Sequence, residues 1–150
     1  MKQRYTYLTL AILTTIIIFV NSLMPANISS EQSGFFVGVA RKVLTFFKID
    51  IGNINLSLLV RKTAHSIFFF LASLFWHMFF KTLMNREPYE PYTLTLNIGL
   101  LIAMTDEFIQ YFTPGRAMMV EDILLDLAGV ATLLLIALII SLIKHKKRDF

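Results

Sequence analysis

Two adjacent carboxylates, Asp106 and Glu107, interrupt an apolar stretch of the sequence that has the length of a membrane helix. A charge near the centre of a membrane costs roughly 2.5–3.5 kcal/mol on insertion scales, so such residues are rare and usually belong to a network or a functional site. The stretch continues through Gln110 to Arg116, which adds an amide and a positive charge close to the carboxylates. This segment is therefore the centre of a candidate site.

Two other apolar stretches carry charged groups at one end. Arg61, Lys62 and His65 open the preceding stretch, and Asp122 and Asp126 begin the following one. Positive and negative groups are nearly balanced, as a buried network requires if desolvation is not to dominate. The predicted binding site has nine members: Arg61, Lys62, His65, Asp106, Glu107, Gln110, Arg116, Asp122 and Asp126.

Three chemistries are open to this set. Cationic side chains beside carboxylates can hold a phosphate or carboxylate group of a lipid-linked or cell-wall molecule. His65 with Asp106 or Glu107 can act as a general acid and base, which makes these three the catalytic candidates. A metal site is disfavoured because only one histidine is near, so we predict no metal and no cofactor. Alternatively, the charges only bind the helices to one another.

The composition is that of an integral membrane protein with one domain, residues 1–150. Hydrophobic residues make up 56% of the 150 residues, and the mean hydropathy is +0.66. The absence of cysteine excludes disulfides, thiolate catalysis and cysteine-ligated zinc. The net charge of +4 lies mostly near the termini, which indicates membrane topology and contact with lipid headgroups rather than a nucleic-acid partner.

Four apolar runs have about the 20 residues that a helix needs to cross a membrane. They predict an all-α membrane protein with spans at about 5–23, 58–83, 92–112 and 123–143. The four prolines, at positions 25, 88, 91 and 114, all fall between these runs, as expected if they mark helix ends. The first run could instead be a signal peptide, but no small-x-small cleavage site follows it, so we predict a retained anchor.

An amphipathic helix is predicted between the first two spans, on the outer face of the membrane. Its apolar side has helical spacing and comprises Phe36, Val39, Ala40, Val43, Leu44 and Phe47, opposite Arg41, Thr45 and Lys48. Positive charges cluster at 2–4 and 144–148, which predicts that both termini are cytoplasmic. The polar ends of the last three spans then share the outer face, with His65, Asp106 and Asp126 at similar depth.

The order and spacing of the polar blocks resemble the VanZ-like family of bacterial membrane proteins. The blocks are Arg61-Lys62-x-x-His65, then Asp106-Glu107-x-x-Gln110 with Pro114-Gly115-Arg116, then Asp122-x-x-x-Asp126-x-x-Gly129. The resemblance extends to Asn21-Ser22 and to the serine-bearing segment 29–33, so it covers nearly the whole chain. It departs at Ala117-Met118-Met119, where small and hydroxyl residues are usual, and at Ile109 and Leu133, where histidine and glycine are frequent.

The resemblance implies a small multi-pass protein of a Gram-positive-type bacterial membrane, in a family named for a member linked to teicoplanin resistance. We expect a pocket that engages a membrane lipid headgroup or a cell-wall precursor and so alters glycopeptide or lipoglycopeptide susceptibility. In this hypothesis Arg61 and Arg116 hold an anionic group, the carboxylates of Glu107, Asp122 and Asp126 orient them, and His65 bridges. The alternatives are an intramembrane enzyme acting on a lipid-linked envelope substrate and a structural or accessory membrane subunit.

Overall fold

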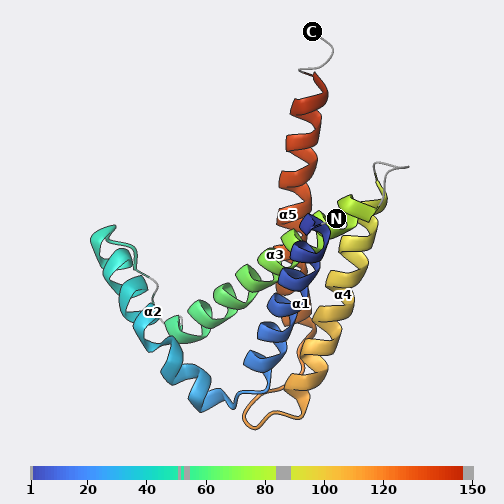
Figure 1. Cartoon of the computed structure of the whole chain (residues 1–150). Helices are drawn as coiled ribbons and strands as arrows, with labels where there is room; N and C mark the ends of the chain where they lie inside the picture. Colours follow the sequence, from blue (N-terminus) through green and yellow to red (C-terminus); the bar gives the residue numbers. More distant parts are fainter. Residues whose placement is uncertain (1, 51, 53–54, 84–88, 147–150) are drawn as a thin grey trace.

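The computed structural model describes residues 2–50, 52, 55–83 and 89–146. Within these ranges the chain forms five α-helices and no strand: α1 (Lys2–Ser22), α2 (Ala26–Phe46), α3 (Leu56–Leu83), α4 (Glu90–Tyr111) and α5 (Val120–Lys146) (Figure 1). The predicted all-α class is confirmed for this part of the chain. Each predicted span corresponds to one helix, with ends that differ by three residues or fewer.

One proline lies inside a helix rather than between two. Pro91 occupies the first turn of α4, where its missing N–H would have no intrahelical partner in any case. Pro25 directly precedes α2, and Pro114 lies in the turn between α4 and α5, both as predicted. Pro88 lies outside the described residues.

Three helices, α1, α3 and α5, are long and apolar enough to cross a membrane. The fourth predicted span, α4, has 22 residues but does not reach the same apolarity. It carries Asp106 and Glu107 near one end and Glu90 at the other, besides several threonines. The charged residues of the candidate site are thus among those that lower the mean hydropathy of α4.

Helix α3 occupies the middle of the fold and packs against each of the other four helices. Helices α1 and α4 run toward the end of the bundle that contains residues 23–25 and 112–119, and α3 and α5 run away from it (Figure 1). We call this the loop end. The buried apolar core comprises Ile18, Phe69, Ala72, Ile102, Ala103 and Val130. Large apolar side chains elsewhere on α1 and α5 are exposed, as expected for helices that face lipid.

Close helix packing depends on small residues next to the polar ones. A Cβ added at Gly129 would lie 2.3 Å from the backbone oxygen of Ser66, so α5 can approach α3 this closely only with glycine there. A Cβ at Gly99 would lie 2.9 Å from Val130, which brings α4 against α5. Both glycines therefore lie where two helices pack closely.

Helix α2 lies where the amphipathic helix is predicted, but it begins directly after Pro25 and ends at Phe46, so Phe47, predicted on its apolar side, lies just beyond it. Lys48, predicted on its polar side, lies beyond the helix in a left-handed conformation with φ of 53°. The helix diverges from the bundle and packs on α3 (Figure 1). Its apolar side chains Phe36 and Val43 remain exposed, so the bundle does not cover this face.

Candidate functional site

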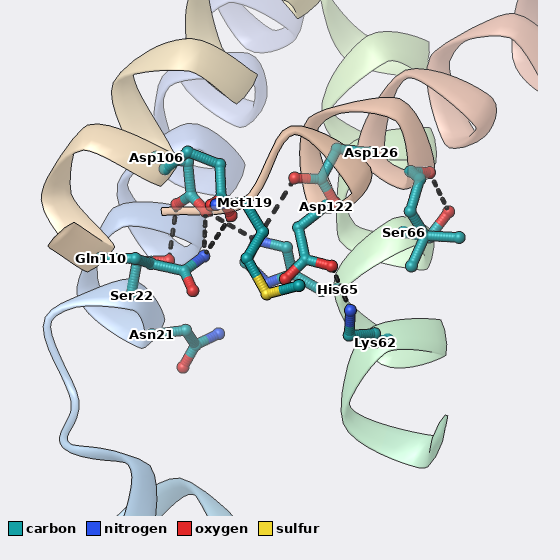
Figure 2. A network of polar contacts seen from close by, with 12 residues as sticks. Asn21, Ser22, Lys62, His65, Ser66, Asp106, Gln110, Met119, Asp122 and Asp126 are labelled. Carbon is teal, nitrogen blue, oxygen red and sulfur yellow. Dashed lines mark hydrogen bonds and ion pairs between the residues drawn. The ribbon is translucent and has the colours of Figure 1, made fainter. Parts of the chain in front are cut away.

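The three polar blocks meet at the loop end around Asp106, whose side chain is fully buried (Figure 2). Ser22, the last residue of α1, donates its hydroxyl to Asp106 Oδ1 at 2.6 Å. The amide of Gln110, one turn along α4, donates to Asp106 Oδ2 at 2.8 Å. Hydrogen bonds to a charged acceptor are stronger than neutral ones, so this carboxylate is held firmly.

His65 connects α3 to both of the other polar helices. Its Nε2 atom lies 2.9 Å from Asp106 Oδ2 on α4 and 3.9 Å from Asp126 Oδ2 on α5 (Figure 2). A hydrogen bond from Nε2 to an ionised carboxylate requires the tautomer or the charged form that has a proton on Nε2. Asp126 is 1% exposed, yet its Oδ2 has no hydrogen-bond partner among the described residues.

Glu107 is equally buried but faces the turn between α4 and α5. Its Oε2 accepts the backbone N–H of Met119 at 2.8 Å, and its Oε1 accepts the Gln110 amide at 3.0 Å. Gln110 therefore bridges the two adjacent carboxylates and places one N–H on each. The result is a fixed pair of buried carboxyl groups with defined orientation.

A further ion pair lies at the edge of the network, between Lys62 of α3 and Asp122 of α5 (Figure 2). Their side chains are 27% and 21% exposed, more than those of the central carboxylates. One turn deeper, the Ser66 hydroxyl donates to the backbone oxygen of Leu125 at 3.1 Å. These contacts join the first turns of α5 to α3.

Arg116 extends from the α4–α5 turn to the end of α1. Its Nη2 donates to the backbone oxygen of Asn21 at 3.0 Å, and its buried Nε has no partner in the described part of the chain. Burial, together with the positive charge of Arg61, lowers the pKa of the Arg116 guanidinium from its usual value. The group still remains charged at physiological pH, because an arginine does not lose its proton in proteins.

Two cavities adjoin this network, and Arg61, His65 and Arg116 line both. The larger, of about 150 Å³, lies between α1, α2 and α3 and is also lined by Asn21, Ser29, Ser33, Phe36, Val60, Ala64 and Phe68. The smaller, of about 30 Å³, is bordered by Lys62, Glu107, Gln110, Asp122, Leu125 and Asp126. The first is large enough for part of a headgroup, and the second for about one water molecule.

A comparison with protein-family models matches the VanZ/LLP1 family over residues 7–141. The chain belongs to this family. The match takes in α1 to α5 almost completely, including every residue of the network. Searches of curated proteins and of solved structures found no significant match.

The structure brings all nine predicted residues of this VanZ/LLP1 chain to the loop end, but it pairs them differently from the hypothesis. Asp122 pairs with Lys62, and Glu107 accepts from Gln110 and Met119. No carboxylate of the described residues forms an ion pair with either arginine. The carboxylates were predicted to orient the two arginines, and no ion pair among the described residues supports that role.

Sequence reasoning gave no role to three groups that hold the VanZ/LLP1 network together. Ser22 donates to Asp106, the backbone of Met119 donates to Glu107, and the Thr113 hydroxyl donates to the Ser22 backbone oxygen at 2.9 Å. The family resemblance already included Ser22 but without a function. A backbone donor leaves no signal in side-chain identity, so Met119 could not be found from residue type.

The structure also brings together a set of metal-ligand types that the sequence analysis disfavoured. One nitrogen of His65 and one oxygen each of Asp106 and Asp126 lie within 4.8 Å of one another. Residues 65, 106 and 126 come from three different helices, so no short sequence spacing could reveal them. A metal is disfavoured from the sequence because only one histidine is near, but two buried carboxylates could take the place of a second histidine as ligands.

Proposed function

We propose that the chain binds the anionic group of a membrane lipid or a lipid-linked cell-envelope molecule between Arg61 and Arg116, and thereby lowers susceptibility to teicoplanin-type glycopeptides. The observation that carries this proposal is the larger cavity, where both arginines face two serines. Arginine presents several N–H donors in a plane and matches phosphate or carboxylate oxygens.

The charge distribution supports an anionic ligand. Within the described residues neither Arg61 nor Arg116 forms an ion pair with a carboxylate, and the positive charge of Arg61 helps to lower the pKa of Arg116. Two like charges that line one cavity repel, and an anion placed between them turns this repulsion into attraction. The Ser29 hydroxyl offers a further donor to the same ligand, whereas the Ser33 hydroxyl already donates to the Ser30 backbone oxygen at 2.9 Å.

The apolar wall of the cavity supports a lipid rather than a free anion. Phe36 on α2 and Val60 and Phe68 on α3 line it beside the arginines. A headgroup on the arginines would leave acyl chains next to these side chains and next to the uncovered apolar face of α2. Lipid recognition typically combines a basic pocket with an apolar surface in this way.

The proposed arrangement in the membrane follows from the charges at the ends of the helices. In it, α1, α3, α4 and α5 cross the bilayer, α2 lies on the outer leaflet and both termini are cytoplasmic in a bacterial cell membrane. Positive residues at 2–4 and 144–146 lie away from the loop end, which favours an outward-facing loop end (Figure 1). Asp106 and Glu107 are buried inside the bundle and away from lipid, which lowers the free-energy cost of placing α4 across the bilayer.

A binding measurement on the purified full chain tests the ligand class. We expect short-chain phosphatidylglycerol to bind in detergent more tightly than phosphatidylcholine, and R61A and R116A to weaken that binding. R41A is the matched control, because Arg41 is exposed on α2 and does not line the cavity. Equal binding of the two lipids, or equal loss in R41A, would contradict the proposal.

A susceptibility measurement tests the biological consequence. A null strain is complemented with wild type, H65A, E107Q, R116A and D122N, and the amount of each protein in the membrane is quantified. We expect R116A to insert normally but to lose protection against teicoplanin. Full protection by R116A and D122N would exclude the proposed role, and disappearance of the variants from the membrane would favour a structural or accessory subunit.

An intramembrane enzyme is the second candidate, and the His65–Asp106 contact favours it. A histidine held at 2.9 Å by a buried carboxylate and lining both cavities has the geometry of a general acid or base. Glu107 is the remaining acid–base candidate. Turnover of a lipid-linked envelope precursor by wild type but not by H65A would support an enzyme, and wild-type protein that changes no such precursor would count against it.

A further inference from the structure

We infer that His65, Asp106 and Asp126 form a binding site for one divalent transition-metal cation such as Zn²⁺. The ligand atoms come from α3, α4 and α5 and lie within 4.8 Å of one another. This inference does not depend on the lipid proposal, since the arginines are not among the ligands.

The two distances from His65 are close to those expected around a cation. His65 Nε2 lies 2.9 Å from Asp106 Oδ2 and 3.9 Å from Asp126 Oδ2. Ligands about 2.0–2.2 Å from a tetrahedral Zn²⁺ lie about 3.3–3.6 Å from one another, which falls between these two separations. To ligate, Nε2 must carry its lone pair and Nδ1 the proton, so the present hydrogen bond to Asp106 would be replaced by a shared metal.

The unpartnered oxygen of Asp126 is independent evidence for a ligand. This side chain is 1% exposed, and its Oδ2 faces His65 without a hydrogen-bond partner among the described residues. A buried carboxylate oxygen left without a donor costs free energy, which a bound cation would recover. The adjoining cavity of about 30 Å³, lined by both His65 and Asp126, has room for one further small ligand.

Charge gives a third argument. Asp106 and Asp126 both lie within 4.0 Å of the His65 imidazole, and Glu107 is buried next to Asp106 in the sequence. No Lys or Arg nitrogen of the described residues lies within 4.0 Å of these three carboxyl groups. The carboxyl groups outnumber the imidazole, and an unpaired negative charge is costly in a region of low dielectric. A divalent cation bound by Asp106 and Asp126 cancels both of their charges.

The nature of the ligands indicates which ions fit. One imidazole nitrogen with two carboxylate oxygens is a set that suits Zn²⁺ or Mn²⁺, whereas Mg²⁺ and Ca²⁺ prefer oxygen ligands alone. Three protein ligands with a fourth position left open are typical of catalytic rather than structural zinc sites. Ser22 and Gln110 both donate hydrogen bonds to Asp106, which fixes the orientation of this carboxylate as a ligand.

Two matched pairs of variants test the site in the purified, EDTA-treated full chain. H65A removes a ligand, whereas H145A removes an exposed histidine at the end of α5. D126N replaces the unpartnered carboxylate by an amide of similar shape, whereas D122N changes a carboxylate in the same cavity that pairs with Lys62. Circular dichroism of each variant would test whether it keeps its helices.

Titration with Zn²⁺ alone, followed by calorimetry, gives the result. We expect one ion per chain in wild type, H145A and D122N, and binding weaker by about tenfold or more in H65A and D126N. We also expect Zn²⁺ to raise the thermal midpoint of wild type, a readout that survives if a variant fails to fold. Absence of Zn²⁺ binding by wild type, or equal binding by H65A and H145A, overturns the inference.

The outcome is separable from that of the proposed function. Loss of phosphatidylglycerol binding in R116A with Zn²⁺ binding retained would concern the lipid proposal alone. Wild type that binds phosphatidylglycerol but no Zn²⁺ would remove only the metal site.

Discussion

Ser22 and Asp106 are 84 positions apart in the sequence, yet the Ser22 hydroxyl donates to Asp106 Oδ1 at 2.6 Å, with both side chains fully buried. This contact fastens the end of α1 to α4 at the point where α4 carries its charge. It also supplies one of the donors that make a buried carboxylate tolerable.

Replacing Ser22 by alanine should therefore destabilise the bundle. The loss of a hydrogen bond to a buried charged group is expected to cost about 2 kcal/mol, seen as a lower midpoint of thermal unfolding in detergent. S30A is the control, because the Ser30 hydroxyl makes an exposed bond within α2. If both variants unfold at the same temperature, the Ser22–Asp106 bond contributes nothing.

G129A should separate α3 from α5. The new Cβ would lie 2.3 Å from the Ser66 backbone oxygen, and backbone cannot move aside as a flexible side chain can. Overpacking of this kind is expected to cost about 1–3 kcal/mol. G38A has open space around its Cβ, so there the better helix propensity of alanine should stabilise α2 by about 0.5–1 kcal/mol. Thermal unfolding of both variants measures the contrast, and a G129A protein as stable as wild type would contradict the packing.

Exchange of the charges of Lys62 and Asp122 should be tolerated. The pair is partly exposed, so K62A is expected to cost only about 0–1 kcal/mol. K62D alone places a third like charge beside Asp122 and Glu107 and should be worse. The double variant K62D/D122K should recover most of that loss in an unfolding measurement. A double variant no better than K62D would mean that the two side chains are not coupled.

Met119 should stabilise the fold through its backbone N–H and not through its side chain. M119P removes the N–H that Glu107 Oε2 accepts at 2.8 Å, and losing this bond to a buried carboxylate should cost about 2 kcal/mol. M119L keeps the N–H and should stay within about 0.5 kcal/mol of wild type, because the Met119 side chain is exposed. Equal stability of M119P and M119L would show that Glu107 does not need this donor.

Several features of the site were predictable because they depend on helical periodicity. Apolar runs of about 20 residues located four of the five helices, and the spacing of Asp106 and Gln110 placed both on one face of α4. The similar depth of His65, Asp106 and Asp126 followed from counting residues from the helix ends, and these side chains do converge. Amphipathic spacing indicated α2 only from Phe36 onward, whereas the helix begins at Ala26, directly after Pro25.

The pairing of the polar groups could not be predicted in the same way. Periodicity gives the face and depth of a side chain, but whether Asp122 meets Lys62 or an arginine depends on the rotation and tilt of two separate helices. Hydropathy alone also does not decide whether α4 crosses the membrane, because its charges lower its hydropathy while the bundle buries them.

The sequence by itself therefore determined an all-α membrane protein with its charges gathered at one end, because hydrophobicity and helical period are local properties of the chain. Only the tertiary structure decided that Ser22 and Gln110 hold Asp106, that Asp126 keeps a buried oxygen without a partner, and that both arginines line a cavity without a carboxylate. Such contacts depend on close approach of helices at positions such as Gly129, where a single Cβ would change the distance between two backbones.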